Sequence, residues 1–536
     1  MIASDAIIKC LEEENVEIIF GYPGGALLPI YESMRKSNIK HILVRQEQSA
    51  AHNASGYARA SGKVGVCMAT SGPGATNLIT GIATAYMDSV PMVIITGQVD
   101  SSLIGKDIFQ EADIVGSTLP FTKYNCLVKN AEDIPRILKE AFYIAKTGRP
   151  GPVLIDIPSD IQQKNINFEY PSEVDIRGYK PISEGHIGQI KRAIRKIKNS
   201  KRPIICAGGG VSSANANREL RIFAEKVGIP VVYTLMGIGA IDSDSKFNFG
   251  MVGSHGHSYA NKLVNKSDLI IVIGARIANR SAITQSAKET DIIHIDIDTA
   301  EIGKNLSADI PVVGDAKNIL SDLIDRLDNI GLEDWINEAE EIKGSYQKKE
   351  EITENINPRK AIKFISDTVD DDTILTGDVG QNQMWCARNF EVKGNRRFIT
   401  SGGLGTMGYS LPASIGAKFG AEDRTVIGVM GDGSIQMLLS ELGVIREYDL
   451  DIKIIVFNNS RLGMVRELQD NTYGKGNNNA VVFKHSPDFV KIADGFGIKG
   501  IKVNSNEDFE KAFKECLDLK EPFLIECIVD SDFSTI

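Results

Sequence analysis

The strongest constraint on the fold comes from two polar segments that each follow an apolar run. Gly431-Asp432-Gly433-Ser434 follows Val426–Met430, and Asn459 follows Ile452–Phe457, 27 residues after Asp432 counted Asp to Asn. A strand that ends in a small-residue turn can present backbone N–H groups to a diphosphate. Asp432 and Asn459 would add the oxygen ligands that Mg²⁺ accepts beside phosphate oxygens. Either turn alone could be an ordinary strand-to-helix turn, but the pair predicts a metal that holds a diphosphate cofactor.

The composition is that of a large protein with several domains. The chain has 536 residues, 42% of them hydrophobic, and 50 glycines, which is too long for one core and predicts several α/β domains. A net charge of −10 argues against a nucleic-acid surface. No apolar run approaches membrane-spanning length and no basic leader precedes the first helical segment. We therefore expect neither a membrane segment nor a removable targeting signal.

The cysteines indicate the compartment. Seven of them stand singly, in odd number and without C-x-x-C spacing. This pattern predicts neither a disulfide framework nor a zinc site. A reducing, cytoplasmic location is the expectation that fits best.

Alternating apolar and helix-like segments predict three α/β domains, at residues 1–170, 186–330 and 358–536. In the first domain, runs such as Val64–Ala69 and Val153–Ile157 alternate with helical stretches, as in a parallel sheet covered by helices. The segment Phe168–His186 loses periodicity and gains turn residues, which predicts a linker. The segment Leu332–Asn357 is charged and helical in pattern, which predicts a solvated helix and a connection. The strands expected in the middle domain are Ile204–Ala207, Pro230–Tyr233, Leu269–Ile273 and Ile292–Ile297.

The outer domains share an outline. Ser71-Gly72-Pro73-Gly74 lies between the apolar runs Val64–Thr70 and Pro91–Thr96, as Gly431-Asp432-Gly433 lies between its own two runs. This suggests two related domains that face each other. Any two βαβ units share the same outline, however, because their crossovers have one hand.

Glu47 is a candidate for chemistry. It follows an apolar strand, in Arg45-Gln46-Glu47-Gln48, and precedes the helical run Ser49–Ala60. Ligands of open α/β sheets gather at such strand ends. A glutamate at this point could equally be a surface acid that starts a helix and is favoured by the helix dipole.

Further motifs stand in one order along nearly the whole chain. They are Gly21-Tyr22-Pro23-Gly24-Gly25, Arg45-Gln46-Glu47-Gln48, Ser71-Gly72-Pro73-Gly74-Ala75-Thr76-Asn77, Tyr86-Met87-Asp88-Ser89-Val90-Pro91, Phe109-Gln110-Glu111-Ala112-Asp113-Ile114-Val115-Gly116, Gly148-Arg149-Pro150-Gly151-Pro152-Val153, Asp378-Val379-Gly380-Gln381, Ser401-Gly402-Gly403-Leu404-Gly405-Thr406-Met407-Gly408 and Leu462-Gly463-Met464-Val465. With the two turns described first, the set resembles the large catalytic subunits of acetohydroxyacid (acetolactate) synthases, which use thiamine diphosphate (ThDP). The resemblance implies three doubly wound parallel-sheet domains of the ThDP-dependent pyruvate oxidase and decarboxylase type.

The resemblance also implies a ThDP site shared by the outer domains. Glu47 would hydrogen-bond the aminopyrimidine ring and favour the imino tautomer, whose nitrogen removes the C2 proton. Met407 would be the apolar wedge that bends the cofactor, although a methionine alone could equally fill a gap in a core. The other implied ThDP ligands are Gly24, Gly25, Gln381, Asp432, Gly433 and Ser434. The implied metal ligands are Asp432, Asn459 and the main-chain carbonyl near Arg461.

The middle domain contains strand-end turns suited to a dinucleotide, including Gly253-Ser254-His255-Gly256 and Gly274-Ala275-Arg276, but no intact G-x-G-x-x-G motif. The resemblance implies FAD with a mainly architectural role, because the net reaction moves no electrons. The residues implied for FAD are Arg149, His255, Gly256, Arg276, Asp296 and Asp315. A related group of acetolactate-forming enzymes lacks FAD, so this alternative stays open.

Several positions depart from the family pattern. Gln46 stands where the family usually has His, Ser159 where it has Lys, and 277–279 where it has Phe-Asp-Asp. Leu468 replaces a Trp that shapes the second-substrate pocket, which leaves the preference between pyruvate and 2-oxobutyrate open. The sequence also stops soon after Ile525–Val529 without the family's C-terminal arm, so we expect a site more open to water. The residues implied for substrate are Gln98, Phe109, Leu468 and Arg280, whose guanidinium could hold a carboxylate.

The implied activity is decarboxylation of pyruvate and transfer of the hydroxyethyl (two-carbon) unit to a second 2-oxo acid. The products would be 2-acetolactate and CO₂, in branched-chain amino acid biosynthesis. In the family, Glu47 and the metal site come from different subunits, so a homodimer or higher homo-oligomer is expected, with a regulatory small subunit as a further partner. A ThDP-dependent pyruvate oxidase or 2-oxo acid decarboxylase, or a non-catalytic binding homologue, remain alternatives.

Overall fold

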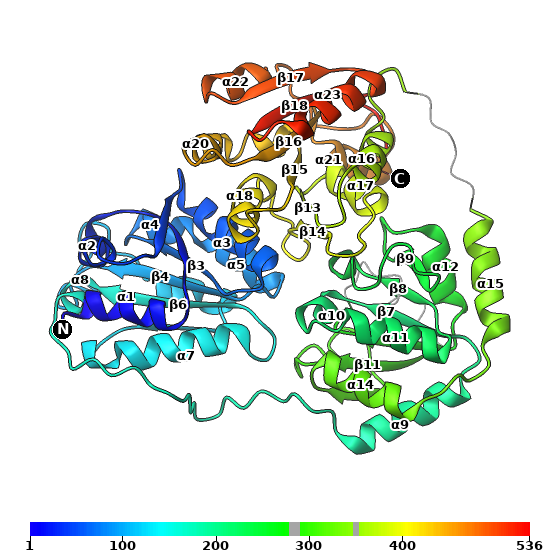
Figure 1. Cartoon of the computed structure of the whole chain (residues 1–536), viewed down its shortest axis with the longest axis horizontal. Helices are drawn as coiled ribbons and strands as arrows, with labels where there is room; N and C mark the ends of the chain where they lie inside the picture. The colour runs from blue at the N-terminus through cyan, green and yellow to red at the C-terminus, as the bar shows by residue number, and fades with distance from the viewer. Residues whose placement is uncertain (278–289, 347–352, 536) are drawn as a thin grey trace.

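The computed structural model describes residues 1–277, 290–346 and 353–535, which form three six-stranded parallel sheets. In Figure 1 the first sheet lies at the left, the middle sheet at the right and the third sheet above both. The predicted fold class is therefore confirmed. The strands expected from the sequence agree with the observed ones to within two residues at either end, as for β15 (Val426–Gly431).

The first sheet has the strand order β2-β1-β3-β4-β6-β5. Its strands are β1 (Ile18–Tyr22), β2 (Lys40–Leu43), β3 (Gly65–Ala69), β4 (Met92–Gln98), β5 (Tyr124–Leu127) and β6 (Pro152–Pro158). One face is covered by α1 (Ala3–Glu13), α2 (Leu28–Met34) and α7 (Ile134–Lys146), and the other by α3 (Glu47–Ser61) and α5 (Ile79–Met87). The central strands are apolar on both faces because helices cover both.

The third sheet repeats this arrangement, with the order β14-β13-β15-β16-β18-β17. Its strands are β13 (Ile374–Gly377), β14 (Arg397–Thr400), β15, β16 (Ile452–Asn458), β17 (Lys499–Val503) and β18 (Phe523–Ile528). Its helices include α16 (Pro358–Thr368), α17 (Gln381–Asn389), α18 (Ser410–Gly420), α20 (Leu442–Glu447), α22 (Phe489–Gly495) and α23 (Asn506–Asp518). Each strand takes the place of its counterpart in the first sheet, so the parallel noticed in the sequence extends to the whole sheet.

The middle sheet has a different order, β12-β11-β10-β7-β8-β9. Its strands are β7 (Pro203–Ala207), β8 (Val231–Tyr233), β9 (Asn248–Met251), β10 (Leu269–Ile273), β11 (Asp291–Asp296) and β12 (Ile310–Val313). Its helices include α9 (Ile187–Asn199), α11 (Asn217–Val227), α12 (Ser258–Lys266), α14 (Ala316–Arg326) and the charged α15 (Glu333–Gly344). Counted from β9 the order is 3-2-1-4-5-6, that of dinucleotide-binding folds, and it reverses between β7 and β10.

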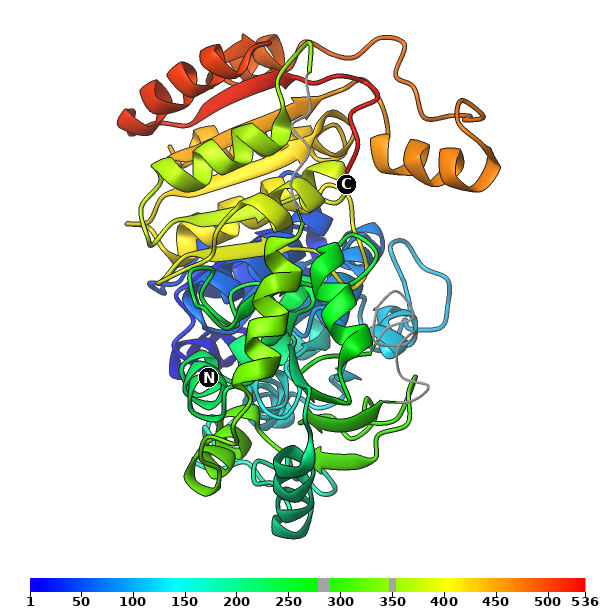
Figure 2. The same cartoon turned by 90° about the vertical axis from the view of Figure 1, so that its right-hand side faces the viewer.

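The domains pack closely on one another. One apolar core runs from the first domain into the third, and another joins the middle domain to the third. Helices α3 and α18 approach so closely that a Cβ built on Gly416 would lie 1.8 Å from the carbonyl oxygen of Asn53. The second view shows the third sheet stacked above the other two domains (Figure 2). The predicted linker 168–186 contains no helix or strand and runs along the bottom of Figure 1.

Within the three described ranges, no helix combines the length and the apolar character needed to cross a membrane.

Candidate active site

Glu47 lies where the carboxyl end of β2 turns into α3. The helix begins at Glu47 itself, two residues earlier than the sequence predicted, and the side chain of Gln46 caps it by accepting the N–H of Ser49 (3.3 Å). The Glu47 side chain is half-buried. Asn77 Nδ2 donates a hydrogen bond to Glu47 Oε2 (2.9 Å). The carboxylate is therefore held by a neighbour from the turn after β3, and it is not an unattached surface acid.

Small residues surround this carboxylate. A Cβ built on Gly24 would lie 2.4 Å from Thr70 Cβ, and one built on Gly74 would lie 2.8 Å from Thr70 Cγ2 and 3.5 Å from Glu47 Oε1. A Cβ on Gly25 would meet nothing within 4 Å. The turns after β1, β2 and β3 thus meet at one edge of the first sheet. A side chain larger than hydrogen at Gly74 would fill the space beside Glu47, and one at Gly24 would clash with Thr70.

Asp432 lies at the matching edge of the third sheet. It begins α19 (Asp432–Ile435) directly after β15 and is only 2% exposed. Its Oδ2 atom is buried and has no hydrogen-bond partner within the described residues. Burial raises the pKa of Asp432 to about 7, and the N–H groups of Ser460 and Arg461 counteract part of this rise. The turn after β16 therefore faces Asp432, as the spacing in the sequence predicted.

These groups fit a divalent cation. A buried carboxylate oxygen without a donor is costly unless a cation or proton satisfies it. Asn459 lies directly before Ser460 and Arg461, whose N–H groups face Asp432, and its Oδ1 accepts the N–H of Arg461 (3.1 Å). One carboxylate, one amide oxygen, one main-chain carbonyl and phosphate oxygens form a ligand set that suits Mg²⁺. Among the described residues there is no cluster of three or more His, Cys, Asp or Glu suited to a metal, and this ligand set needs none.

Ser434 and Gly433 belong to the same turn, and Gln381 bonds Asn459 on the neighbouring one. Ser434 Oγ bonds the N–H and the carbonyl of Gly431 (3.0 and 3.1 Å), which closes the turn. Gln381 donates to Glu467 (2.6 Å) and to the Phe533 carbonyl (2.8 Å) and accepts from Asn459 (2.9 Å). Gln381 thus bonds protein groups at both ends of its amide. A Cβ on Gly433 would approach Leu462 to 2.9 Å. Met407 is half-buried in a loop, unlike a methionine that fills a core.

Sequence reasoning assigned no role to Asp378, which organises the loop that carries Met407. Asp378 is completely buried at the carboxyl end of β13, and burial raises its pKa to about 7. Its Oδ1 accepts the N–H groups of Val379 (2.8 Å) and Gly408 (2.9 Å), and its Oδ2 accepts that of Ser410 (2.8 Å). An acidic residue at the end of an apolar run was the available signal, the same one that identified Asp432.

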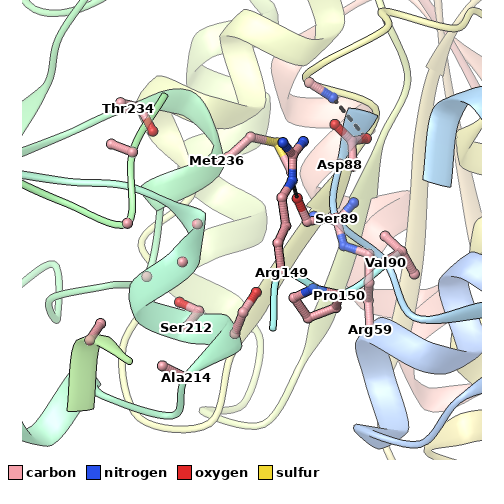
Figure 3. Close-up of a pocket in the computed structure, with 18 of the residues that line it drawn as sticks. Arg59, Asp88, Ser89, Val90, Arg149, Pro150, Ser212, Ala214, Thr234 and Met236 are labelled. Carbon is pink, nitrogen blue, oxygen red and sulfur yellow. Dashed lines mark hydrogen bonds between the residues drawn. The ribbon is translucent and has the colours of Figure 1, made fainter. Parts of the chain in front are cut away.

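A large cleft opens at the point where the strand order of the middle sheet reverses. Its volume is about 1790 Å³, and all three domains line it. Figure 3 shows Asp88, Ser89 and Arg149 of the first domain on one side, and Ser212 and Met236 of the middle domain on the other. The cleft exceeds the roughly 300–1,000 Å³ of common small-ligand pockets, so it has room for a dinucleotide.

Glycines bring the backbone to the cleft. A Cβ on Gly208 would lie 2.2 Å from the carbonyl oxygen of Gly274, so the turns after β7 and β10 pack backbone against backbone. Gly274 belongs to one of the predicted strand-end turns, whereas the Gly208–Gly210 run was not predicted. Its signal was a G-x-G-x-x-S pattern, in which Ser213 takes the place of the last glycine.

Charged residues line the cleft between the domains. Arg149 donates to Ser89 Oγ (2.9 Å) and to the carboxylate of Glu301 (2.9 Å). Burial, together with the nearby Arg149 charge, lowers the pKa of Arg276, and burial raises that of Asp296 to about 6. The cleft therefore has charged and buried polar side chains, which fit the phosphates and ribose of a dinucleotide.

Of the remaining FAD candidates, one lines the cleft but also caps a helix, and two do not line the cleft. Asp315 lines the cleft, but its Oδ1 caps α14 by accepting the N–H groups of Lys317 (2.9 Å) and Asn318 (3.3 Å). His255 and Gly256 do not line the cleft, and His255 Nδ1 lies 3.3 Å from Ser254 Oγ. The structure thus brings four of the six expected FAD residues together, namely Arg149, Arg276, Asp296 and Asp315.

The expected substrate residues differ in exposure. Gln98 is buried, and its Nε2 donates to Asp156 Oδ2 and to the Ala112 carbonyl, both at 2.9 Å. Phe109 is 86% exposed, and Leu468, on α21 (Gly463–Tyr473), is 50% exposed. Arg280 lies outside the described residues.

Comparison with known proteins decides the family. The thiamine pyrophosphate (ThDP) enzyme models match in three parts: the N-terminal TPP binding domain at residues 1–117, the central domain at 190–323 and the C-terminal TPP binding domain at 378–527. The chain is 47% identical to a probable acetolactate synthase large subunit of Methanococcus aeolicus, over 99% of the chain and 92% of that protein. The chain belongs to the acetolactate synthase large-subunit family.

Two further members of the family show the same extent of similarity. The probable acetolactate synthase large subunit of Methanocaldococcus jannaschii is 48% identical over 99% of the chain and 92% of its own length. The acetolactate synthase large subunit of Corynebacterium glutamicum is 44% identical over 99% of the chain and 87% of its own length. The resemblance seen in the sequence is thus confirmed, and both outer domains are ThDP-binding domains.

Proposed function

We propose that this protein is an acetolactate synthase, which converts two molecules of pyruvate into 2-acetolactate and CO₂ in branched-chain amino acid biosynthesis. The observation that carries the proposal is the pair of strand-end sites in a chain of this family. Glu47 is held at the edge of the first sheet, and Asp432 has a buried, unpartnered oxygen at the edge of the third. Both sites belong to ThDP-binding domains.

Bound ThDP supplies a carbon nucleophile and takes up the electrons released when CO₂ leaves. Glu47 would accept or return a proton at the pyrimidine ring, and Asn77 would keep its carboxylate in one orientation. Met407 would contact the cofactor from its loop, whose backbone Asp378 holds in place. Gly24 and Gly25 would leave room for the ring end, and Gln381, Gly433 and Ser434 would lie at the diphosphate end.

The metal would be Mg²⁺, held by Asp432, Asn459 and a main-chain carbonyl near Arg461. The unpartnered Asp432 oxygen supports this assignment, because a cation would satisfy it and would bridge it to the diphosphate. Burial raises the pKa of Asp432, and a bound cation would favour its ionised form.

FAD would occupy the cleft of the middle domain. The strand order, the backbone contact between Gly208 and Gly274 and the side chains of Arg149, Arg276 and Asp296 support a dinucleotide there. Because the net reaction moves no electrons, the flavin would hold the three domains together. Asp315 would also border the cleft, whereas His255 and Gly256 would need a change of position to reach it.

The active unit would be a homodimer or a larger homo-oligomer. Phe109 and Leu468 are large apolar residues with at least half of their surface exposed. A second subunit would cover them and bring them to a shared substrate pocket, with Gln98 behind it and Arg280 as a carboxylate ligand. A regulatory small subunit is a further proposed partner, because the relatives are named large subunits. All seven cysteines are free thiols, which fits the proposed cytoplasmic location.

Product analysis tests the proposed activity. Purified protein would be incubated with pyruvate, ThDP and Mg²⁺, with and without FAD, and the products identified. Acetolactate contains a new carbon–carbon bond, whereas acetaldehyde or acetate would instead indicate a 2-oxo acid decarboxylase or a pyruvate oxidase. Acetolactate formation without FAD would refute the flavin assignment and leave the activity in place. If the protein binds ThDP but shows no turnover, the proposed enzymatic activity is refuted and a binding role is favoured.

A further inference from the structure

Glu441 lies in the interface between the first and third domains and has no part in the chemistry described above. It ends the 3₁₀ turn η5 (Leu439–Glu441) of the third domain, and it is completely buried. Its Oε1 atom accepts the backbone N–H of Arg45, at 2.9 Å. Arg45 lies in the turn between β2 and α3, two residues before Glu47. A carboxylate of the third domain therefore holds the turn that carries the candidate catalytic residue of the first.

The second oxygen of Glu441 faces the same turn. Glu441 Oε2 and Ser49 Oγ are both buried, and neither has a hydrogen bond of normal length to any described residue. Burial raises the pKa of Glu441 to about 7, and the Arg45 N–H, the Ser49 hydroxyl and the Gln46 backbone counteract part of this rise, as groups close to the carboxylate do. A carboxylate is favoured beside the first turn of a helix, where N–H groups point outward. These contacts all belong to the segment 45–49.

We propose that Glu441 is a positioning residue for Glu47: it holds the turn at residues 45–49 against the third domain and thereby sets the direction of the Glu47 carboxylate. The role toward Glu47 rests on the proposed function, whereas the contact with Arg45 does not. Glu47 is the first residue of α3, so any rotation of this turn moves its carboxylate directly. A misplacement of about 1 Å in a catalytic group can lower a rate by about 100-fold.

Other contacts keep the two domains together without Glu441. The Tyr448 hydroxyl accepts the N–H of Leu43 (3.1 Å), and the Arg45 guanidinium pairs with Glu447. Helix α18 packs tightly along α3, as Gly416 shows. Loss of the Glu441 contact should therefore loosen the turn and leave the domains docked.

Three variants distinguish the effect of side-chain length at Glu441 from the effect of its charge and from the effect of weaker packing between the domains. Glu441→Asp keeps the charge but is one methylene shorter, so its carboxylate no longer reaches the N–H of Arg45. Glu441→Gln keeps the reach and one acceptor but loses the charge. Tyr448→Phe removes two other hydrogen bonds across the same interface, from the Leu43 N–H (3.1 Å) and to the His41 carbonyl (3.4 Å), and serves as the matched control. All three are conservative changes, so the folded protein is available for each measurement.

The first measurement needs no cofactor. Hydrogen–deuterium exchange of backbone amides would be followed by mass spectrometry on peptides that report on residues 45–50. We expect Glu441→Asp to exchange several-fold faster there, and Glu441→Gln and Tyr448→Phe to match the wild type. The second measurement is the rate at which the C2 proton of bound ThDP exchanges with D₂O, by NMR at saturating ThDP. Here Glu441→Asp should be slower by about tenfold or more, with the other two variants close to wild type.

Three results would overturn the proposal. One is a Glu441→Asp protein that matches the wild type in both measurements. Another is a Glu441→Gln protein as impaired as Glu441→Asp, since charge and not reach would then matter. The third is equal impairment in Tyr448→Phe, which would show that general docking is responsible. A wild type that forms no acetolactate, with faster amide exchange in Glu441→Asp, would instead refute the proposed function and leave the contact with the turn established.

Discussion

The first and third domains have the same strand order, and each has a buried carboxylate at the same place in its sheet. The groups beside that carboxylate differ between the two domains. In the first sheet, Gln98 Nε2 donates to Asp156 on β6 (2.9 Å), and in the third, Asn458 Nδ2 donates to Glu526 on β18 (2.8 Å). The registers correspond, because each carboxylate faces the residue two places before the amide. An amide–carboxylate pair therefore occurs at the same place in both sheets.

The residue on the neighbouring edge strand differs. Glu526 faces Lys502 and pairs with it at 3.0 Å, whereas Asp156 faces Leu127. Without a cation beside it, burial raises the pKa of Asp156 to about 7. A shared topology therefore fixes where a carboxylate lies but not its charge, which depends on a neighbour from another strand. The two candidate sites differ in a similar way, because Glu47 bonds the Asn77 amide, whereas Asp432 Oδ2 has no hydrogen-bond partner within the described residues.

The largest expected effect separates the chemistry of the two domains. In Glu47→Gln, acetolactate formation should fall by about 10²–10⁴-fold, the usual contribution of a positioned acid–base group. ThDP should still bind, because the diphosphate site is intact. The checks are product assays and cofactor titration, with Glu32→Gln, an exposed carboxylate of the same domain, as control. Unchanged turnover would remove Glu47 from the mechanism.

Asp432→Asn should produce the opposite pattern in the third domain. Its affinity for ThDP with Mg²⁺ should fall by at least about 10- to 100-fold, the loss seen when even an outer-shell partner of a metal ligand is removed. Titration of the cofactor-free protein with ThDP in the presence of Mg²⁺, followed by fluorescence, measures this. Asp423→Asn, at an exposed position, is the control. Normal affinity with normal turnover would place the metal elsewhere.

Gly416→Ala tests the packing that joins the two domains. A Cβ there would lie 1.8 Å from the Asn53 carbonyl oxygen, so α3 and α18 must move apart. We expect a loss of about 1–3 kcal/mol in the free energy of unfolding, typical of overpacking. Gly495→Ala, in α22 with nothing within 4 Å of the new Cβ, should be neutral or slightly stabilising. Equal effects on the unfolding midpoint would contradict the close contact.

The last comparison concerns the paired carboxylates. The pKa of Asp156 is raised from 3.8 to about 7 on folding, so the folded state holds its proton more firmly. Asp156 therefore makes folding less favourable as pH rises from 4 to 7, by up to about 1.4 kcal/mol per pH unit. Asp156→Asn removes this slope, so its melting temperature relative to wild type should rise between pH 5 and pH 8.

Glu526→Gln provides the comparison. It breaks the ion pair with Lys502, so its melting temperature should fall at both pH values. A relative gain with pH in Glu526→Gln, or none in Asp156→Asn, would show that Leu127 and Lys502 do not account for the difference between the domains.

Much of the fold was predictable because local patterns in the sequence determine where strands and turns form. Apolar runs such as Val426–Met430 became strands, and the two polar turns at Asp432 and Asn459 met as expected. Family motifs led to Glu47 for the same reason, since each motif is contiguous in the sequence. The Gly208–Gly210 run was overlooked because its pattern lacks the last glycine of the usual motif.

Two of the contacts that only the structure revealed join different domains. Glu441 meets Arg45 across 396 positions of sequence, and Asp88 of the first domain accepts the N–H of Gly403 in the third (2.6 Å). No local periodicity predicts such a pair, because the partner arrives only when two domains dock.

By itself, the sequence determined the three parallel sheets, the strand-end turns and the kinds of side chain that those turns carry. It could do so because periodicity and turn chemistry act over a few residues. Tertiary structure alone decided that, among the described residues, Asp432 Oδ2 has no hydrogen-bond partner, that Asp156 faces Leu127 and no cation, and that Glu441 holds the turn before Glu47. The physical reason is that the energy of a buried charge depends on the groups around it, and folding brings these from distant parts of the chain.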